Sequence, residues 1–128
     1  IGMSSYSTAG KVRQAEGTSG ETHQGAHLVP MAVYRKLGLS PYSALVINLT
    51  KESHDFIDGG WVPLWNAALR EGREITGADV RKWVGEAIQN SPDPEMTPEL
   101  KGTLGWRFEV ELAEIGITDT TVIVPRKQ

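Results

Sequence analysis

Residues 48–58 read NLTKESHDFID, and this stretch decides how we interpret the fold. The mostly apolar run before it, residues 41–49, predicts a loop followed by a buried strand. Thr50 or Ser53 then supplies the oxygen that caps a helix. The sequence therefore predicts a strand that leads directly into a helix, and this helix is expected to break at Gly59-Gly60.

A second phrase, GAHLVP at residues 25–30, lies upstream. Residues 26–29 are predicted to form a short extended segment that ends at Pro30, which lacks the amide N–H that a strand interior requires. Residues 31–37 then suit a short helix ending at Gly38. Two extended segments and a helix in this arrangement indicate a small α+β unit.

The second half of the chain is predicted to be mainly helical. A first helix is predicted over residues 61–69. A second is predicted to start at Thr76-Gly77-Ala78-Asp79, which resembles a capping box. A third is predicted to start at Thr97-Pro98-Glu99 and to end at Gly116. Residues 120–124 are expected to form a short strand. Side chains at helical spacing on the second and third helices are assigned to the core: Val80, Trp83, Val84, Ala87, Ile88, Leu100, Leu104, Trp106, Phe108 and Leu112.

Composition sets mild limits on function. The 128 residues suffice for a single α+β domain, 1–128, and residues 1–20 are small and polar, which is typical of loose surface loops. No run approaches the roughly 20 apolar residues that span a bilayer, so we expect no membrane segment. The lack of cysteine excludes disulfides and thiolate metal sites. A net charge of -3 counts mildly against a protein that binds nucleic acid over its whole surface.

His54 and Asp58 are the first candidates for a metal site. They are four residues apart, so they project from the same side of a helix, about one turn from each other. Imidazole together with carboxylate suits Zn²⁺, Mn²⁺ or Ni²⁺ and tolerates Mg²⁺ less well. The alternative interpretation is that both residues belong to a solvated helix face.

His27 is a candidate general base on a strand whose backbone is held in place. Its imidazole has a reference pKa of about 6.5, so it can take a proton from water near neutral pH. A water activated in this way can attack a phosphodiester bound to a metal ion, while the ion offsets charge on the phosphate and the leaving oxygen. The alternative is a hydrogen-bonded structural histidine.

Three further residues are candidates for the same site. The side-chain amide of Asn48 can bridge backbone groups and hold the loop that presents a histidine, or Asn48 is an ordinary turn residue. Glu21 and His23 precede His27 by six and four residues. Either can supply a further metal ligand, or His23 can polarise the base; the alternative is that both are exposed loop residues.

Basic and aromatic residues offer contacts to nucleic acid. Lys51, Arg35 and Lys36 are among the basic residues that can contact phosphates beside the site. Trp61 and Trp65 can stack on bases. For the basic residues, the alternative is a solvated helix surface.

Residues 21–58 resemble the ββα-metal core of HNH/endonuclease VII-type nucleases, the His-Me finger superfamily. The resemblance lies in the order of three motifs: His-hydrophobic-hydrophobic-Pro, then Asn, then His-x-x-x-Asp. The match covers under a third of the chain. In that superfamily the first histidine is the general base, the asparagine braces the loop, and the helix histidine with a partner four residues on binds the metal. The resemblance implies these roles for His27, Asn48, His54 and Asp58, with one divalent ion (Mg²⁺, Mn²⁺, Zn²⁺ or Ni²⁺) as cofactor.

A second resemblance concerns the helical remainder. AALREG at residues 67–72, followed by Ile75-Thr76, is similar to the tails of bacterial polymorphic-toxin nuclease domains, including types named for a Glu and three His. The chain departs from the superfamily in one respect: many members carry a metal-binding Asp, Glu or His directly before the base, where this chain has Ala26. Either His23 or Glu21 supplies that ligand, or Ala26 is an engineered substitution that silences a toxin.

The leading hypothesis is a metal-dependent endonuclease that hydrolyses DNA, with RNA as an alternative substrate, and acts as the toxin domain of a bacterial effector. Its partners would be the nucleic acid and a cognate immunity protein. The chain starts at Ile1 rather than methionine, so we expect a piece of a longer protein, secreted or delivered to act in the target-cell cytoplasm. One alternative is a metal-independent ribonuclease that uses His23 and His27 as an acid–base pair. Another is a helical protein-interaction module with no enzymatic activity.

Overall fold

The computed structural model describes residues 3–5, 23–40 and 44–128 and has an α+β fold. Its strands and helices, in chain order, are β1 (Met3–Ser5), β2 (His23–His27), α2 (Met31–Lys36), β3 (Leu45–Thr50), α3 (Lys51–Glu71), β4 (Ile75–Thr76), α4 (Gly77–Gln89), α5 (Pro98–Glu114) and β5 (Val122–Val124). In the described part of the chain no helix is long and apolar enough to cross a membrane.

The two phrases that we singled out meet in an antiparallel sheet. Its strand order is β1-β3-β2, so β3 is the central strand. Along the β2–β3 pair, His27 lies opposite Val46 and His23 lies opposite Thr50. Because Thr50 directly precedes α3, the register brings the start of β2 beside the start of that helix.

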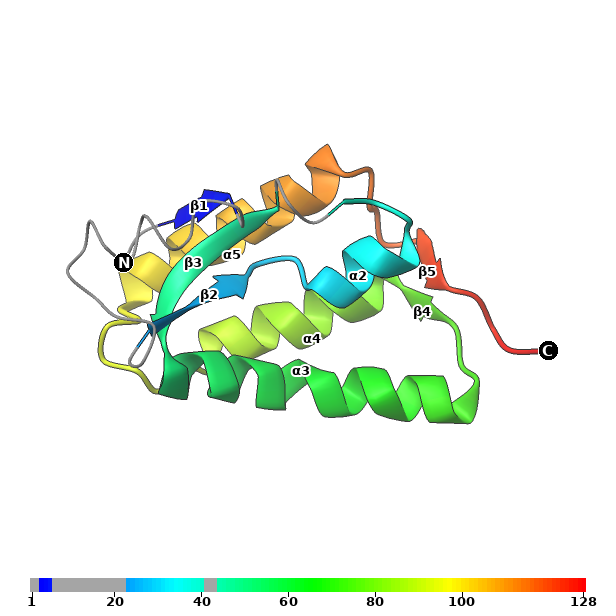
Figure 1. Cartoon of the computed structure of the whole chain (residues 1–128), viewed down its shortest axis with the longest axis horizontal. Helices are drawn as coiled ribbons and strands as arrows, with labels where there is room; N and C mark the ends of the chain where they lie inside the picture. Colours follow the sequence, from blue (N-terminus) through cyan, green and yellow to red (C-terminus); the bar gives the residue numbers. More distant parts are fainter. Residues whose placement is uncertain (1–2, 6–22, 41–43) are drawn as a thin grey trace.

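Figure 1 shows how the helices accompany this sheet. α3, α4 and α5 all run along the length of the molecule, and α4 packs against both α3 and α5. The small sheet formed by β4 and β5 lies toward the end of the molecule where α3 finishes. This arrangement leaves the first turns of α3 next to β2 and β3, which is where the candidate residues are.

Helix α3 is continuous, so the predicted break at Gly59-Gly60 is wrong. The helix runs from Lys51 to Glu71 through both glycines and through Pro63, and it includes the separate helix predicted over residues 61–69. A Cβ atom at position 60 would lie 2.9 Å from the Cβ atom of Ala87 on α4. Gly60 is therefore explained by the close approach of two helices and not by a turn. The helix ends instead at Gly72, whose φ of 66° is the left-handed cap conformation that glycine favours.

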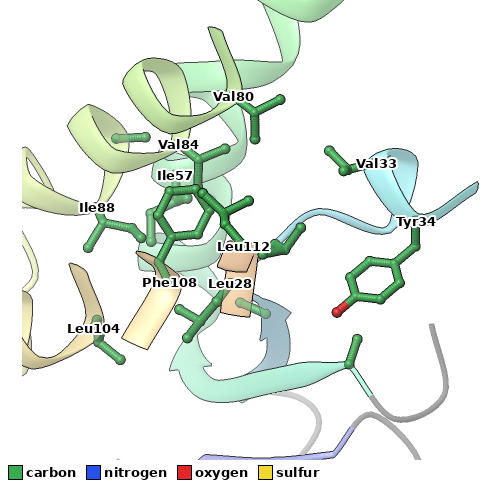
Figure 2. Close-up of a cluster of buried hydrophobic side chains, with 14 of the residues drawn as sticks. Leu28, Val33, Tyr34, Ile57, Val80, Val84, Ile88, Leu104, Phe108 and Leu112 are labelled. Atoms are coloured by element: carbon green, nitrogen blue, oxygen red, sulfur yellow. The ribbon is translucent and has the colours of Figure 1, made fainter. Parts of the chain in front are cut away.

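The core lies between the sheet and the three long helices. Figure 2 shows Phe108 and Leu112 of α5 facing Val84 of α4 and Ile57 of α3, with Leu28 beside them. Their helical spacing predicted this arrangement for α4 and α5. Trp106 is an exception, because 64 % of it is exposed and its assignment to the core was wrong. Trp83 is half-buried against the core and stacks under the Arg73 guanidinium.

Helix starts follow the predicted caps. Thr50, not Ser53, caps α3, and its hydroxyl accepts a hydrogen bond from the Ser53 amide at 3.2 Å. The Asp79 carboxylate accepts from the Thr76 amide at 2.9 Å, as expected of a capping box, and Thr97 caps α5. These groups satisfy amides that have no partner within the helix.

Some strand boundaries differ from the prediction. Residues 1–20 were predicted to be loose, but Met3–Ser5 forms β1 on the edge of β3; residues 6–20 lie outside the described residues. β2 covers residues 23–27 rather than 26–29, so the strand ends at His27 itself. β4 was not predicted, because two residues are too short for an alternating pattern. Its partner β5 falls within the predicted range 120–124.

Candidate active site

One cavity of about 220 Å³ brings His27, His54 and Asp58 together. The remaining lining residues are Pro30, Met31, Ala32 and Trp61. One side of the cavity is the segment from His27 to Tyr34, which we call the β2–α2 wall. The other side is the first half of α3, which we call the α3 wall. The sequence prediction that these three residues share a site is consistent with this placement.

His54 and Asp58 face each other across one turn of α3. The distance from His54 Nδ1 to Asp58 Oδ2 is 3.5 Å, and the distance from the same nitrogen to Asp55 Oδ1 is 3.8 Å. His54 Nδ1 is buried and makes no hydrogen bond within the described residues. Two ligand atoms held at about 2.0–2.1 Å from one tetrahedral ion lie about 3.4 Å apart. The His54–Asp58 pair therefore has the separation that a shared divalent ion requires.

His27 lies on the opposite wall and is adapted to remain neutral. Burial, and after it the nearby positive charges of His54 and Arg35, together lower the pKa of His27 from 6.5 to about 4. At neutral pH the imidazole is therefore unprotonated, as a general base must be before it accepts a proton. The preceding residue, Ala26, is 7 % exposed and belongs to the hydrophobic core.

A buried carboxylate holds the β2–α2 wall. Glu111 of α5 is 3 % exposed; one of its oxygens accepts from the Val29 amide at 3.1 Å and the other from the Tyr34 hydroxyl at 2.9 Å. Burial and Glu111 together raise the pKa of Tyr34, so the hydroxyl keeps its proton and donates. Because Val29 and Tyr34 flank the residues that line the cavity, Glu111 fixes the position of this wall.

A second carboxylate holds the start of the α3 wall. Asp93, in the link between α4 and α5, accepts hydrogen bonds from the hydroxyls of Thr50 and Ser53, each at 2.8 Å. Ser53 is also 3.0 Å from the hydroxyl of Ser91. A negative charge at a helix N-terminus is favourable to the helix dipole. This cluster sets where α3 begins, at Lys51, three residues before His54.

The other predicted site residues that the structure describes are not among the residues that line the cavity. Asn48 is buried within β3 opposite Gly25, which suits a bracing role in the sheet and not an end-of-strand position. The backbone of His23 pairs with Thr50 at the start of α3. Glu21 lies outside the described residues. Arg35 and Lys36 are exposed on the last turn of α2, and Lys51 is exposed on the first turn of α3.

Size alone would not have selected this cavity. Three surface hollows beside α4 and α5 are larger, at about 520, 420 and 540 Å³. None of the residues that line these three is a histidine. The small cavity is therefore the candidate site because of its chemistry.

Sequence reasoning missed Glu111 and the place of Trp61. Glu111 looked like an ordinary surface charge, although it is three residues from Phe108 and next to Leu112, on the apolar face of its helix. A carboxylate at such a position is a signal that a buried donor must lie opposite. Trp61 was considered only as a stacking residue, because the predicted break at Gly59-Gly60 separated it from His54.

Comparisons of this chain with protein-family models, with curated proteins and with solved structures gave no match. The arguments about function therefore rest on the geometry of the site and on the resemblance in residues 21–58.

Proposed function

We propose that this chain is a metal-dependent endonuclease that hydrolyses phosphodiester bonds of DNA, with RNA as an alternative substrate, and that it is the toxin domain of a bacterial effector. The observation that carries the proposal is the meeting of His27, His54 and Asp58 in one cavity between β2 and the start of α3. An immunity protein, an effector that delivers the domain and action in the target-cell cytoplasm belong to the same proposal.

His54 and Asp58 would hold the ion, and water or substrate oxygens would complete its coordination. The separation of their ligand atoms and the buried Nδ1 of His54 fit this role. No group of three or more His, Cys, Asp or Glu ligands occurs within the described ranges, so waters would fill the remaining positions until substrate oxygens replace them, as is common for Mg²⁺. When bound, the ion would offset negative charge on the phosphate.

His27 would remove the proton from the attacking water. Its low pKa keeps it unprotonated at neutral pH, and its position on a strand end held through Val29 limits its motion. Lys51, Arg35 and Lys36, which are exposed on the two helices that contribute to the cavity, would contact phosphates of the strand. Such contacts make binding sensitive to salt.

The position of Ala26 bears on the missing ligand. Its side chain is in the core, so a histidine there would displace packed apolar groups. This supports the explanation that a ligand comes from His23 or Glu21 over the explanation that Ala26 replaced a native ligand. Ala26→His is accordingly expected to reduce stability without raising cleavage.

Cleavage of supercoiled plasmid with Mg²⁺, Mn²⁺, Zn²⁺ or Ni²⁺, with and without EDTA, tests the proposal. We expect His27→Ala to reduce cleavage by about 10²–10⁴-fold, as loss of a general base does, while metal binding is largely kept. His54→Ala should reduce both. Equal loss of metal from the two variants would contradict the assigned roles.

The same assay separates the alternatives. Cleavage of RNA that is insensitive to EDTA would favour the metal-independent ribonuclease with His23 and His27. If neither DNA nor RNA is cleaved and no metal binds, the interaction module is the better description.

A further inference from the structure

Four residues form one stripe along α3 because the helix is unbroken. His54, Asp58, Trp61 and Trp65 follow one another at spacings of four, three and four residues, which places them on the same side of a helix. The first three line the cavity, and Trp65 is 5 % exposed beneath them. A helix broken at Gly59-Gly60 would have separated the tryptophans from the histidine and the aspartate.

The Asp58 carboxylate is shared between two partners on this stripe. The Trp61 indole Nε1–H donates to Asp58 Oδ1 at 3.3 Å, whereas Oδ2 is the oxygen that lies 3.5 Å from His54 Nδ1. The indole therefore holds one oxygen and leaves the other directed at the histidine. Since Asp58 is 46 % exposed, a carboxylate without this bond would be free to rotate into solvent.

The indole of Trp61 is itself supported from below. Its ring meets the ring of Trp65 edge-on, with centroids 6.2 Å apart and planes at 87°. This T-shaped arrangement is favourable for aromatic pairs and restricts the rotation of the upper ring. The buried Trp65 ring therefore restricts the Trp61 ring, and the Trp61 N–H in turn restricts the Asp58 carboxylate.

We propose that Trp61 is a positioning residue that orients the Asp58 carboxylate for a divalent ion shared with His54. This inference rests on the proposed metal-dependent function and adds to it a residue for which neither the His-x-x-x-Asp spacing nor the nuclease resemblance provides a role. Outer partners of metal ligands typically change metal affinity by about 10–100-fold when they are removed. Trp61 would act through Asp58 and would not touch the reacting atoms.

The test is calorimetric titration of Zn²⁺ into the metal-free whole chain and into Trp61→Phe. Phenylalanine keeps an aromatic ring against Trp65 and removes only the N–H donor and part of the ring. We expect about 10-fold weaker Zn²⁺ binding for Trp61→Phe. Trp106→Phe is the matched control, because Trp106 is an exposed tryptophan on α5 away from the cavity, and its replacement should leave Zn²⁺ affinity unchanged.

A second readout does not depend on affinity. In a ¹H–¹⁵N spectrum of the wild-type chain, addition of Zn²⁺ should move the indole N–H signal of Trp61 more than that of Trp106. In Asp58→Ala the Trp61 signal should no longer respond. A tryptophan that only fills space would change thermal stability when replaced, but its indole signal would not follow the ion through Asp58.

The outcomes separate this inference from the nuclease proposal. If the wild-type chain and Trp61→Phe bind Zn²⁺ equally, the role of Trp61 is wrong and the nuclease proposal stands. If Zn²⁺ binding requires His54, Asp58 and Trp61 but no nucleic acid is cleaved, the nuclease proposal is wrong and the role of Trp61 stands. If the wild-type chain binds no ion, both are wrong.

Discussion

The β2–α2 wall and the α3 wall each depend on a carboxylate from the second half of the chain, but the two carboxylates lie in different surroundings. Glu111 is almost completely buried and binds a backbone amide and a phenol. Asp93 is partly exposed and binds two hydroxyls at a helix start. The α3 wall has further support from the close contact between Gly60 and Ala87. The comparison teaches that the wall carrying His27 draws its carboxylate support from one buried group, whereas the wall carrying His54 and Asp58 combines a partly exposed carboxylate with a close helix contact.

The largest effect should follow removal of the buried carboxylate. Glu111→Ala leaves the Val29 amide and the Tyr34 hydroxyl without their partner in an apolar environment. We expect a loss of about 3 kcal/mol in the free energy of unfolding, because each unsatisfied buried group costs about 1–3 kcal/mol. Denaturant unfolding measures this change. Glu114→Ala, on the exposed side of the same helix, is the control and should lose less than about 0.5 kcal/mol; equal losses would remove the distinction between the walls.

A smaller effect is expected at the α3 wall. Asp93→Ala removes the acceptor for Thr50 and Ser53, but Thr50 is partly exposed, so water can replace the carboxylate there, and the buried Ser53 keeps the Ser91 hydroxyl as a partner. The expected loss is about 1 kcal/mol, the usual value for a helix-capping interaction. Glu86→Ala, an exposed acidic residue on α4, controls for the loss of charge. An Asp93→Ala loss as large as that of Glu111→Ala would show that the helix start also depends on a single group.

The smallest effect concerns the protonation of His27 and not the groups that hold the two walls in place. NMR titration of the His27 ring protons should give a pKa of about 4, and His54→Ala should move it back toward 6.5, because one of the causes of the shift is removed. The folded pKa lies below the unfolded value, so the unfolded chain binds this proton more readily. The stability contributed by neutral His27 is therefore complete above pH 6.5 and is lost as the pH falls toward 4. A His27 pKa near 6.5 in the wild-type chain would mean that the β2–α2 wall does not bury the ring.

The sequence predicted the helix starts, the buried strand and the apolar helix faces, because these features depend on residues close together in the chain. Thr50, Thr76 and Thr97 were recognised as helix starts because capping depends on residues within one turn. The buried strand expected within residues 41–49 followed from an apolar run and is observed as β3, and the apolar faces of α4 and α5 followed from periodicity.

The errors arose where a distant residue decides the local structure. Gly60 is within a helix because Ala87 must approach it, and nothing near position 60 carries that information. The functions of Glu111 and Asp93 depend on partners 82 and 43 residues away in the chain. Of the candidate site, the sequence predicted His27, His54 and Asp58 but not the groups that hold them in place.

The bond between Glu111 and Val29 also has a consequence for the order of events during synthesis. The GAHLVP segment leaves the ribosome early, whereas its partner carboxylate belongs to the last long helix of the chain. Strands β2 and β3 and the start of α3 can pair as soon as they emerge, but the loop after His27 has no acceptor for its buried amide until residue 111 is available. A nascent chain that stops before α5 therefore contains His27, His54 and Asp58 but lacks the carboxylate that holds the β2–α2 wall, so we expect the cavity between them to form only once α5 has been made.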